Sequence, residues 1–81
     1  MENAVKIGVI GCGSVAMGAY LPLVQRLQLQ RYPLELVYAC DLDASKAAAA
    51  QEKFGIKRTT TDFEEVLASD EVDLVLVLTA M

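Results

Sequence analysis

The sequence predicts an α/β fold of the doubly wound type, in which helices cover both faces of a parallel sheet. Two observations support this prediction. Apolar, β-branched runs such as Ala4 to Ile10 and Leu74 to Leu78 are typical of strands buried on both faces. Segments with helix capping and stop residues separate these runs along the chain. Strands that alternate with helices in this way are joined by right-handed crossovers and form a parallel sheet.

A glycine turn follows the first strand and opens a helix. Its small residues, Gly11, Gly13 and Ala16, stand in the pattern G-x-G-x-x-A. Gly11 lets the chain turn tightly, Gly13 removes a side chain where a pyrophosphate must approach, and Ala16 permits close packing of helix on strand. An anion at such a turn lies on free N–H groups at the positive end of the helix dipole. The pattern therefore predicts a dinucleotide site formed by Gly11, Cys12, Gly13, Ser14, Val15 and Ala16, with an ordinary strand-to-helix turn as the alternative.

The helix after this turn contains two residues that disfavour a regular α-helix, Gly18 and Pro22. We expect a short first turn, a break or kink near Tyr20, and a continuation from Pro22 to about Gln28, since proline is tolerated best in the first turn of a helix. At the start of the helix, the Ser14 hydroxyl has two compatible roles: donation to a pyrophosphate oxygen and capping of the helix.

The second strand, Leu34 to Asp41, ends in an acidic residue. It follows a lengthened connection in which Pro33 favours an extended backbone. In a dinucleotide-binding fold, an acid at this place accepts hydrogen bonds from the adenosine ribose. Asp41 has this role or, alternatively, starts a polar loop and caps the next helix. Asp43 is the better capping candidate, so we assign Asp41 and the adjacent Leu42 to the ribose site.

The second helix has clear boundary residues. Asp43 or Ser45 caps its start, and Gly55 ends it in a left-handed conformation. The segment Arg58 to Thr60 is long enough for only a short third strand.

The last part of the chain contains a short helix and a buried strand. The spacing of Thr61 and Glu64 predicts a capping box for the helix. The strand Leu74 to Leu78 follows. A doubly wound sheet has the strand order 3-2-1-4, and its ligands bind in the crevice at the carboxyl ends of the strands. This arrangement places Thr79 beside Gly11 and Asp41.

Composition excludes several classes of function. A chain of 81 residues, 54% hydrophobic and 22% charged, forms one globular domain at most. Its formal net charge of −4 at pH 7 provides no basic patch for a nucleic-acid partner, so we expect none. The longest apolar run, Leu74 to Met81, is shorter than the ~20 residues of a membrane span, and the N-terminus lacks a secretory pattern. These features predict a cytoplasmic protein that contacts no membrane.

The two cysteines, Cys12 and Cys40, are too few and too widely spaced for a disulfide scaffold, and there is no histidine to complete a zinc site. We therefore expect no metal. If the first two strands are neighbours, both cysteines lie near one end of the sheet. They are then small thiols that stay reduced or, alternatively, the two halves of a redox clip.

With these elements in place, the chain resembles the N-terminal domain of the glucose-fructose oxidoreductase, inositol dehydrogenase and MocA family of nicotinamide-dependent oxidoreductases. The matching segments follow the order of the family and cover nearly the whole chain: Lys6 to Gly13, Leu21 and Pro22, Ala39 to Asp41, Lys53 to Ile56, Thr61 to Leu67, and Val72 to Val75. The resemblance implies a Rossmann fold that binds NAD(P) and hydride transfer at a sugar, cyclitol or related polyol. Thr79 matches the threonine that follows strand four in the family, where the backbone passes the cofactor.

NAD is the expected cofactor. The charge of Asp41 disfavours the 2′-phosphate of NADP, and Leu42 supplies no arginine to offset that charge. Lys46 or Arg58 would weaken the preference if either reached the site.

Parts of the resembled family have no counterpart in this chain. The family's Glu-Lys-Pro motif, and the histidine or aspartate from its second domain, would follow Met81. We therefore expect residues 1–81 to be the N-terminal part of a dinucleotide-binding domain, with no catalytic residues and no turnover of its own. The strand Leu74 to Leu78 would have an open edge, which predicts self-association, most simply as a two-fold dimer.

Two other classes of function remain open at this point. A Rossmann unit without chemistry would bind a nucleotide for sensing or regulation. A methyltransferase that uses S-adenosylmethionine also has a glycine turn and an acid on its second strand. Ala16 and the segment Phe63 to Glu65 favour the oxidoreductase over the methyltransferase.

Overall fold

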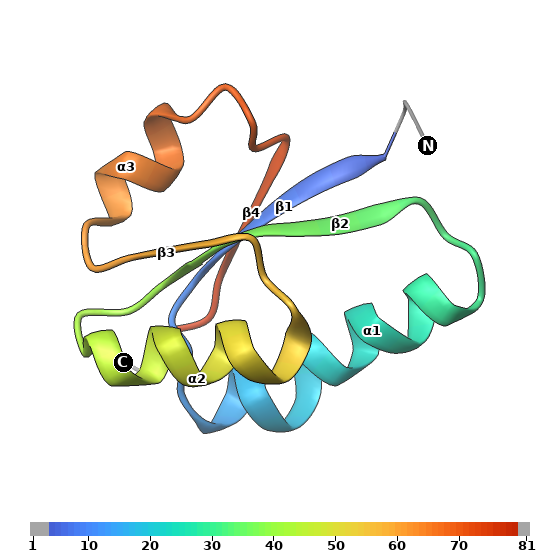
Figure 1. Cartoon of the computed structure of the whole chain (residues 1–81), viewed down its shortest axis with the longest axis horizontal. Helices are drawn as coiled ribbons and strands as arrows, with labels where there is room; N and C mark the ends of the chain where they lie inside the picture. The colour runs from blue at the N-terminus through green and yellow to red at the C-terminus, as the bar shows by residue number, and fades with distance from the viewer. Residues whose placement is uncertain (1–3, 80–81) are drawn as a thin grey trace.

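The computed structural model describes residues 4–79, which form a four-stranded parallel sheet with helices on both faces (Figure 1). One face carries the π-helical turn η1 (Ala16–Tyr20) with α1 (Leu21–Leu29) and α2 (Ala44–Phe54), and the other carries α3 (Phe63–Ala68). The predicted strand order 3-2-1-4 is confirmed, since the sheet runs β3-β2-β1-β4. The strands are β1 (Val5–Ile10), β2 (Leu34–Cys40), β3 (Arg58–Thr60) and β4 (Leu74–Val77).

Parallel pairing brings the carboxyl ends of the strands to one edge of the sheet. β1 lies between β2 and β4, with Ile10 opposite Cys40 on one side and opposite Val77 on the other. The register of β1 on β2 shifts between Ile7 and Gly8. The segments that follow β1, β2 and β4 therefore leave the sheet side by side, and this arrangement positions the candidate site.

Two apolar clusters hold the helices to the sheet. On the face of α1 and α2, Val9 and Leu21 are completely buried. On the face of α3, the completely buried Val66 packs in one cluster with Val37 and Cys40. Burial of one such apolar side chain contributes roughly 1.5–3 kcal/mol. The short helix α3 is therefore held mainly by its packing on the sheet.

Gly8 lies where α3 comes closest to β1. A Cβ atom at this position would lie 2.6 Å from Cγ1 of Val66 and 3.3 Å from Cγ1 of Val72. The absence of a side chain at Gly8 thus allows α3 and the segment before β4 to pack on the centre of the sheet.

The expected break or kink near Tyr20 takes the form of a π-helical turn, Ala16–Tyr20, through which the helix continues without a break. In that turn the Leu21 N–H donates to the Ala16 carbonyl, five residues back. Pro22 has no N–H for the next α-helical bond, and its ring would clash with the carbonyl four residues back. The wider turn accommodates this residue, so Pro22 enters the first turn of α1 while the helix stays intact.

Both later helices begin at an aspartate. Asp43 caps α2, as predicted, and accepts a backbone N–H of the first turn at 3.0 Å; Gly55 ends the helix with φ of 67°. The predicted capping box of α3 is wrong, since Asp62 is the cap in place of Thr61 and accepts the Glu64 N–H at 3.0 Å. An aspartate at the N-cap is preferred to a threonine, and this preference explains the difference of one residue.

Candidate functional site

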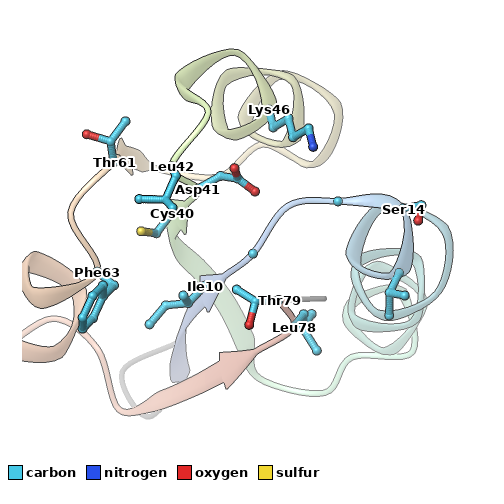
Figure 2. Close-up of a pocket in the computed structure, with 13 residues that line it drawn as sticks. Ile10, Ser14, Cys40, Asp41, Leu42, Lys46, Thr61, Phe63, Leu78 and Thr79 are labelled. Atoms are coloured by element: carbon cyan, nitrogen blue, oxygen red, sulfur yellow. The ribbon is translucent and has the colours of Figure 1, made fainter. Parts of the chain in front are cut away.

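A pocket of about 360 Å³ opens at the carboxyl edge of the sheet (Figure 2). Four segments line it: the end of β1 with the glycine turn, the segment from Cys40 into the first turn of α2, the start of α3, and the residues after β4. Its volume falls within the range of small-ligand sites, about 300–1,000 Å³. The predicted crevice at the strand ends is therefore present.

Most of the predicted site residues line this pocket. Those that do so are Gly11, Gly13, Ser14, Val15, Asp41, Leu42 and Thr79. The side chains of Cys12 and Ala16 do not line it, because they are buried behind the turn with 2% and 0% exposure. Their contribution to a ligand site is limited to the backbone and to the packing of the turn.

Gly11 holds the glycine turn between two strands. Its N–H donates to the Cys40 carbonyl at 2.7 Å, at the end of β2. A Cβ at Gly11 would lie 2.7 Å from the Thr79 nitrogen and 2.8 Å from the Leu78 carbonyl carbon. Its φ of 102° also lies in the region that favours glycine. The turn after β1 thus depends on glycine here for both its conformation and its contact with the segment after β4.

Gly13 has a different environment, since it borders the pocket and a Cβ there would meet no atom within 4 Å. The fold itself therefore does not require a glycine at this position. The Met17 N–H donates to the Gly13 carbonyl at 2.9 Å, so the helix begins at Gly13. The N–H groups of the next three residues precede the first intrahelical donor and have no intrahelical acceptor.

Asp41 is fixed at the wall of the pocket by two backbone groups. Its Oδ2 accepts the Cys12 N–H at 2.8 Å, and its Oδ1 accepts the Asp43 N–H at 2.9 Å. Each carboxylate oxygen retains a lone pair for a further donor. The half-buried carboxylate is thus oriented by the protein and still able to accept hydroxyl groups of a ligand.

The two cysteines lie near the pocket but in different core clusters. Cys12 packs with Ile7 and Val9, whereas Cys40 packs with Val37 on the α3 side, and both thiols are free. The Cys12 Sγ donates to the Cys40 carbonyl at 3.5 Å. Burial, with the nearby charge of Asp41, raises the pKa of Cys12 to about 11, and burial also raises the pKa of Cys40. This placement favours reduced thiols over the redox clip.

Six lining residues were not assigned to the site from the sequence, although Lys46 was considered as a cation that would affect cofactor preference if it reached the site. They are Ile10, Cys40, Lys46, Thr61, Phe63 and Leu78. Figure 2 shows Lys46 extending from α2 toward the same part of the pocket as the Asp41 carboxylate, and Phe63 at the opposite end. Phe63 is 50% exposed at the start of α3. Phe63 could have been recognised from the sequence as an aromatic residue directly after Asp62, the cap of α3. Lys46 could have been recognised as a lysine one turn after Asp43, the cap of α2.

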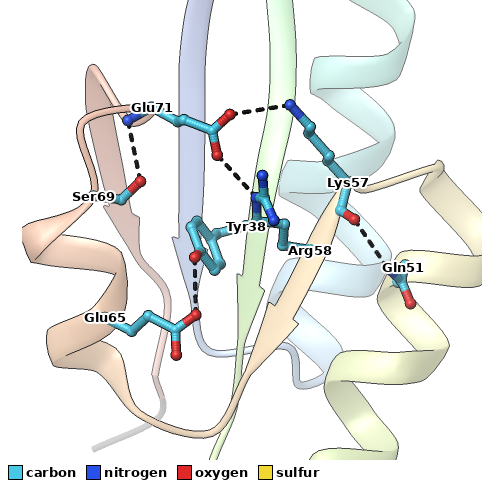
Figure 3. A network of polar contacts seen from close by, with 7 residues as sticks. All are labelled: Tyr38, Gln51, Lys57, Arg58, Glu65, Ser69 and Glu71. Carbon is cyan, nitrogen blue, oxygen red and sulfur yellow. Dashed lines mark hydrogen bonds and ion pairs between the residues drawn. The ribbon is translucent and has the colours of Figure 1, made fainter.

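A second polar cluster lies beside α3, outside the pocket (Figure 3). The Tyr38 hydroxyl donates to Glu65 Oε2 at 2.8 Å, and Glu71 accepts Lys57 Nζ at 3.0 Å and Arg58 Nε at 2.8 Å. The hydrogen bond with Glu65 raises the pKa of Tyr38, whereas Lys57 and Arg58 hold the pKa of Glu71 below its usual value. The cluster joins the segment before β4 to the start of β3, so its role is structural.

Across residues 4–79, no helix is long and apolar enough to cross a membrane. Over the same range, the Cys, Asp and Glu residues form no group of three that could hold a metal ion. The polar chemistry of the pocket therefore comes from the glycine turn, the Asp41 carboxylate and the Lys46 ammonium group, together with neighbouring hydroxyls.

Comparison with protein families gives a match over residues 5–81 to an oxidoreductase family with an NAD-binding Rossmann fold. One curated relative, an uncharacterised oxidoreductase of Rhizobium meliloti, is 32% identical over 75 residues, which cover 93% of this chain and 21% of the relative. The chain thus spans about a fifth of the length of the relative that it matches.

Two solved structures illustrate the similarity of the fold. The myo-inositol dehydrogenase from Lactobacillus casei, in complex with NAD(H) and myo-inositol, has a TM-score of 0.75 and 32% identity over 94% of this chain and 22% of its own. The 3-ketoreductase KijD10 from Actinomadura kijaniata, in complex with NADP and TDP-benzene, has a TM-score of 0.77 and 27% identity over 90% of this chain and 21% of its own. One neighbour thus contains NAD(H) and the other contains NADP.

Proposed function

Because this chain belongs to the glucose-fructose oxidoreductase, inositol dehydrogenase and MocA family, we propose that it binds a nicotinamide dinucleotide across the carboxyl edge of its sheet. We further propose that residues 1–81 are the N-terminal part of an oxidoreductase acting on a sugar, cyclitol or related polyol. When bound, the dinucleotide supplies the hydride-accepting or hydride-donating ring. The activity and substrate class are inferred from the relatives, of which this chain spans about a fifth.

The open space beside Gly13 is the observation that carries the proposal. A side chain here would meet no protein atom, yet the position borders the pocket next to free N–H groups of a helix start. Such a cradle suits a pyrophosphate that must approach the backbone closely. Gly11, Ser14 and Val15 line the same pocket.

The remaining walls of the pocket suit an adenosine group. Asp41 is oriented to accept the ribose hydroxyls, and its charge favours NAD(H) over NADP(H). Leu42 and Phe63 are 89% and 50% exposed and present apolar surface to the pocket. An apolar wall of this kind suits the flat adenine ring. Thr79 lies against Gly11 and completes the wall after β4.

We propose that residues 1–81 alone do not turn over a polyol, because they contain no histidine and span only about a fifth of the length of the relatives. The free thiols of Cys12 and Cys40 support the proposal of a cytoplasmic protein, and the formal net charge of −4 supports the proposal that it has no nucleic-acid partner.

Titration with NADH tests the proposed function. We expect saturable binding of NADH by isothermal titration calorimetry, with weaker binding of NADPH and no heat from S-adenosylmethionine. Saturable binding of S-adenosylmethionine without binding of NADH would replace the oxidoreductase with a methyltransferase. No binding of any of the three would overturn the dinucleotide proposal.

A homodimer is the proposed assembly, since β4 pairs only with β1 among the described strands. Its side chains Leu74 and Val77 are 46% and 65% exposed, so an apolar strand edge faces solvent. Sedimentation equilibrium should give a dimer that Val77→Lys weakens. Leu29→Lys, at an 81% exposed position of α1, is the matched control and should leave the dimer unchanged. A folded monomer at high micromolar concentration would contradict the proposal.

A further inference from the structure

Phe63 reaches the pocket as the first residue of a short helix. α3 has six residues, of which only Val66 is completely buried. Phe63 itself is 50% exposed and lies at one end of the pocket (Figure 2). A helix of this length is not stable on its own, so its position depends on contacts with the sheet. The contacts that hold α3 therefore also determine where Phe63 lies.

Glu65 ties α3 to two neighbouring strands. Its Oε2 accepts the Tyr38 hydroxyl of β2 at 2.8 Å (Figure 3), and its Oε1 accepts the Thr60 hydroxyl of β3 at 2.9 Å. Hydrogen bonds to an ionised carboxylate are stronger than those between neutral groups. Tyr38 is 7% exposed, so the protein shields this contact from most of the surrounding water. A single carboxylate thus fixes the distance of α3 from both strands.

Thr60 connects this contact to the residues on either side of the pocket. Its hydroxyl oxygen accepts the Asp62 N–H at 3.1 Å, directly before α3 begins. Its carbonyl accepts the Asp41 N–H at 3.2 Å, directly after β2 ends. The chain is therefore held on both sides of Phe63, at Asp62 and at Glu65.

The three residues of this contact are not part of the pocket wall. Tyr38, Thr60 and Glu65 do not line the pocket, whereas Phe63 does. A ligand in the pocket therefore touches Phe63 and not Glu65. A change at Glu65 can reach the ligand only through the position of α3.

We propose that Glu65 is a positioning residue that holds Phe63 where the adenine ring of the dinucleotide packs against it. The phenyl ring stacks on the base, and the two hydroxyl contacts of Glu65 keep that ring in place while the ligand binds. This inference rests on the proposed dinucleotide function and adds the residue on which the apolar wall of the pocket depends.

A double-mutant cycle on cofactor binding tests the inference. Dissociation constants for NADH are measured by calorimetry for the full 81-residue chain, for Glu65→Ala, for Phe63→Ala and for the double variant. Glu64→Ala is the matched control, because it removes the same charge from the same turn of α3 and its exposed side chain does not line the pocket. Glu65→Gln is the conservative variant, because its amide offers an acceptor to one hydroxyl and a donor to the other.

We expect Phe63→Ala to weaken NADH binding by about tenfold, which lies within the range for a base stacked on an aromatic side chain. Glu65→Ala should weaken it by about threefold, at the lower end of the coupling between residues in one network. In the Phe63→Ala background the loss of Glu65 should have no further effect, since no phenyl ring is left to position. Glu65→Gln and Glu64→Ala should bind NADH within about twofold of the wild-type chain.

Four results would overturn the inference. An equal loss from Glu65→Ala in both backgrounds would show that Glu65 does not act through Phe63, and unchanged binding would remove its positioning role. An equal loss from Glu64→Ala would assign the effect to charge. NADH binding that Phe63→Ala leaves unchanged would reject the inference while the proposed function stands.

Two further measurements keep the test decisive. Circular dichroism establishes that each variant is folded at the temperature of the titration. If Glu65→Ala is unfolded, Tyr38→Phe takes its place in the cycle, because it removes only one of the two hydroxyl donors. Absence of NADH binding by the wild-type chain would reject the proposed function and, with it, this inference.

Discussion

The carboxylate of Asp41 accepts the backbone N–H of Cys12 at 2.8 Å, so the acid at the end of β2 is tied directly to the glycine turn after β1. The two residues are 29 positions apart in the sequence. A single side chain thus orients the turn and, in the proposed function, binds the ribose. A change at Asp41 should therefore affect both the strength and the selectivity of cofactor binding.

Asp41→Ser is expected to weaken NADH binding and to reduce or reverse the preference for NADH over NADPH. A neutral hydroxyl can no longer repel a 2′-phosphate, and it offers fewer acceptor sites to the ribose. Calorimetric titration with both cofactors measures the effect. Asp73→Ser is the control, because Asp73 accepts the Lys6 N–H at 3.0 Å at the opposite edge of the sheet. Unchanged selectivity in the Asp41 variant would contradict the ribose assignment.

Gly13→Ala should weaken NADH binding without destabilising the fold. The added methyl group meets no protein atom within 4 Å, so the melting temperature should stay close to that of the wild-type chain. Because the methyl group stands where the pyrophosphate approaches, NADH should bind about tenfold more weakly, equivalent to about 1.4 kcal/mol. Gly18→Ala is the matched control, since its methyl group also meets nothing within 4 Å but lies outside the pocket. Equal NADH affinity in the two variants would argue against a pyrophosphate at this turn.

In contrast to Gly13→Ala, which should leave the stability unchanged, Gly8→Ala should destabilise the fold. Its Cβ would lie 2.6 Å from Cγ1 of Val66, which is completely buried. Overpacking of this kind costs about 1–3 kcal/mol. Urea denaturation of Gly8→Ala, Val66→Ala and the double variant measures the coupling between the two sites. Additive losses in the double variant would show that the contact with Val66 does not limit position 8.

Protonation of the Glu71 carboxylate should contribute to the loss of folding stability in acid. Lys57 and Arg58 hold its pKa below the usual value of 4.5, so its contribution is present above about pH 4.5 and is lost as the pH falls through the lowered pKa. Glu71→Gln should therefore melt at a lower temperature than the wild-type chain at pH 7, and the two curves should converge in acid. Thermal melts followed by circular dichroism test this, with Glu52→Gln on α2 as the control. A constant difference between wild type and Glu71→Gln at all pH values would contradict the assignment.

The fold was largely predictable because its signals are local. The run before Gly11 predicts a buried strand, and Asp43 and Gly55 mark the two ends of α2, as the structure confirms. The π-helical turn was not predictable in the same way. Proline at position 22 indicates a conflict with an α-helix, but its resolution depends on how the helix packs on the sheet.

The candidate site was predictable where it follows a strand directly and less so elsewhere. Gly13 and Asp41 stand at strand ends, so their neighbourhood follows from the parallel sheet. Lys46 and Phe63 reach the pocket from helices, and their positions depend on how α2 and α3 lie against the sheet edge.

The pairing of β1 with β4 has a consequence for the order in which the chain folds. Ile7 lies opposite Leu74, and Gly11 closes against Thr79, so the pocket joins segments separated by nearly the full described length. Contacts of such high sequence separation are costly in loop entropy and form slowly. The pocket beside the glycine turn is therefore completed only when β4 pairs with β1. A ligand in the pocket then binds the completed sheet and stabilises it by mass action, which makes protection from proteolysis a direct measure of occupancy.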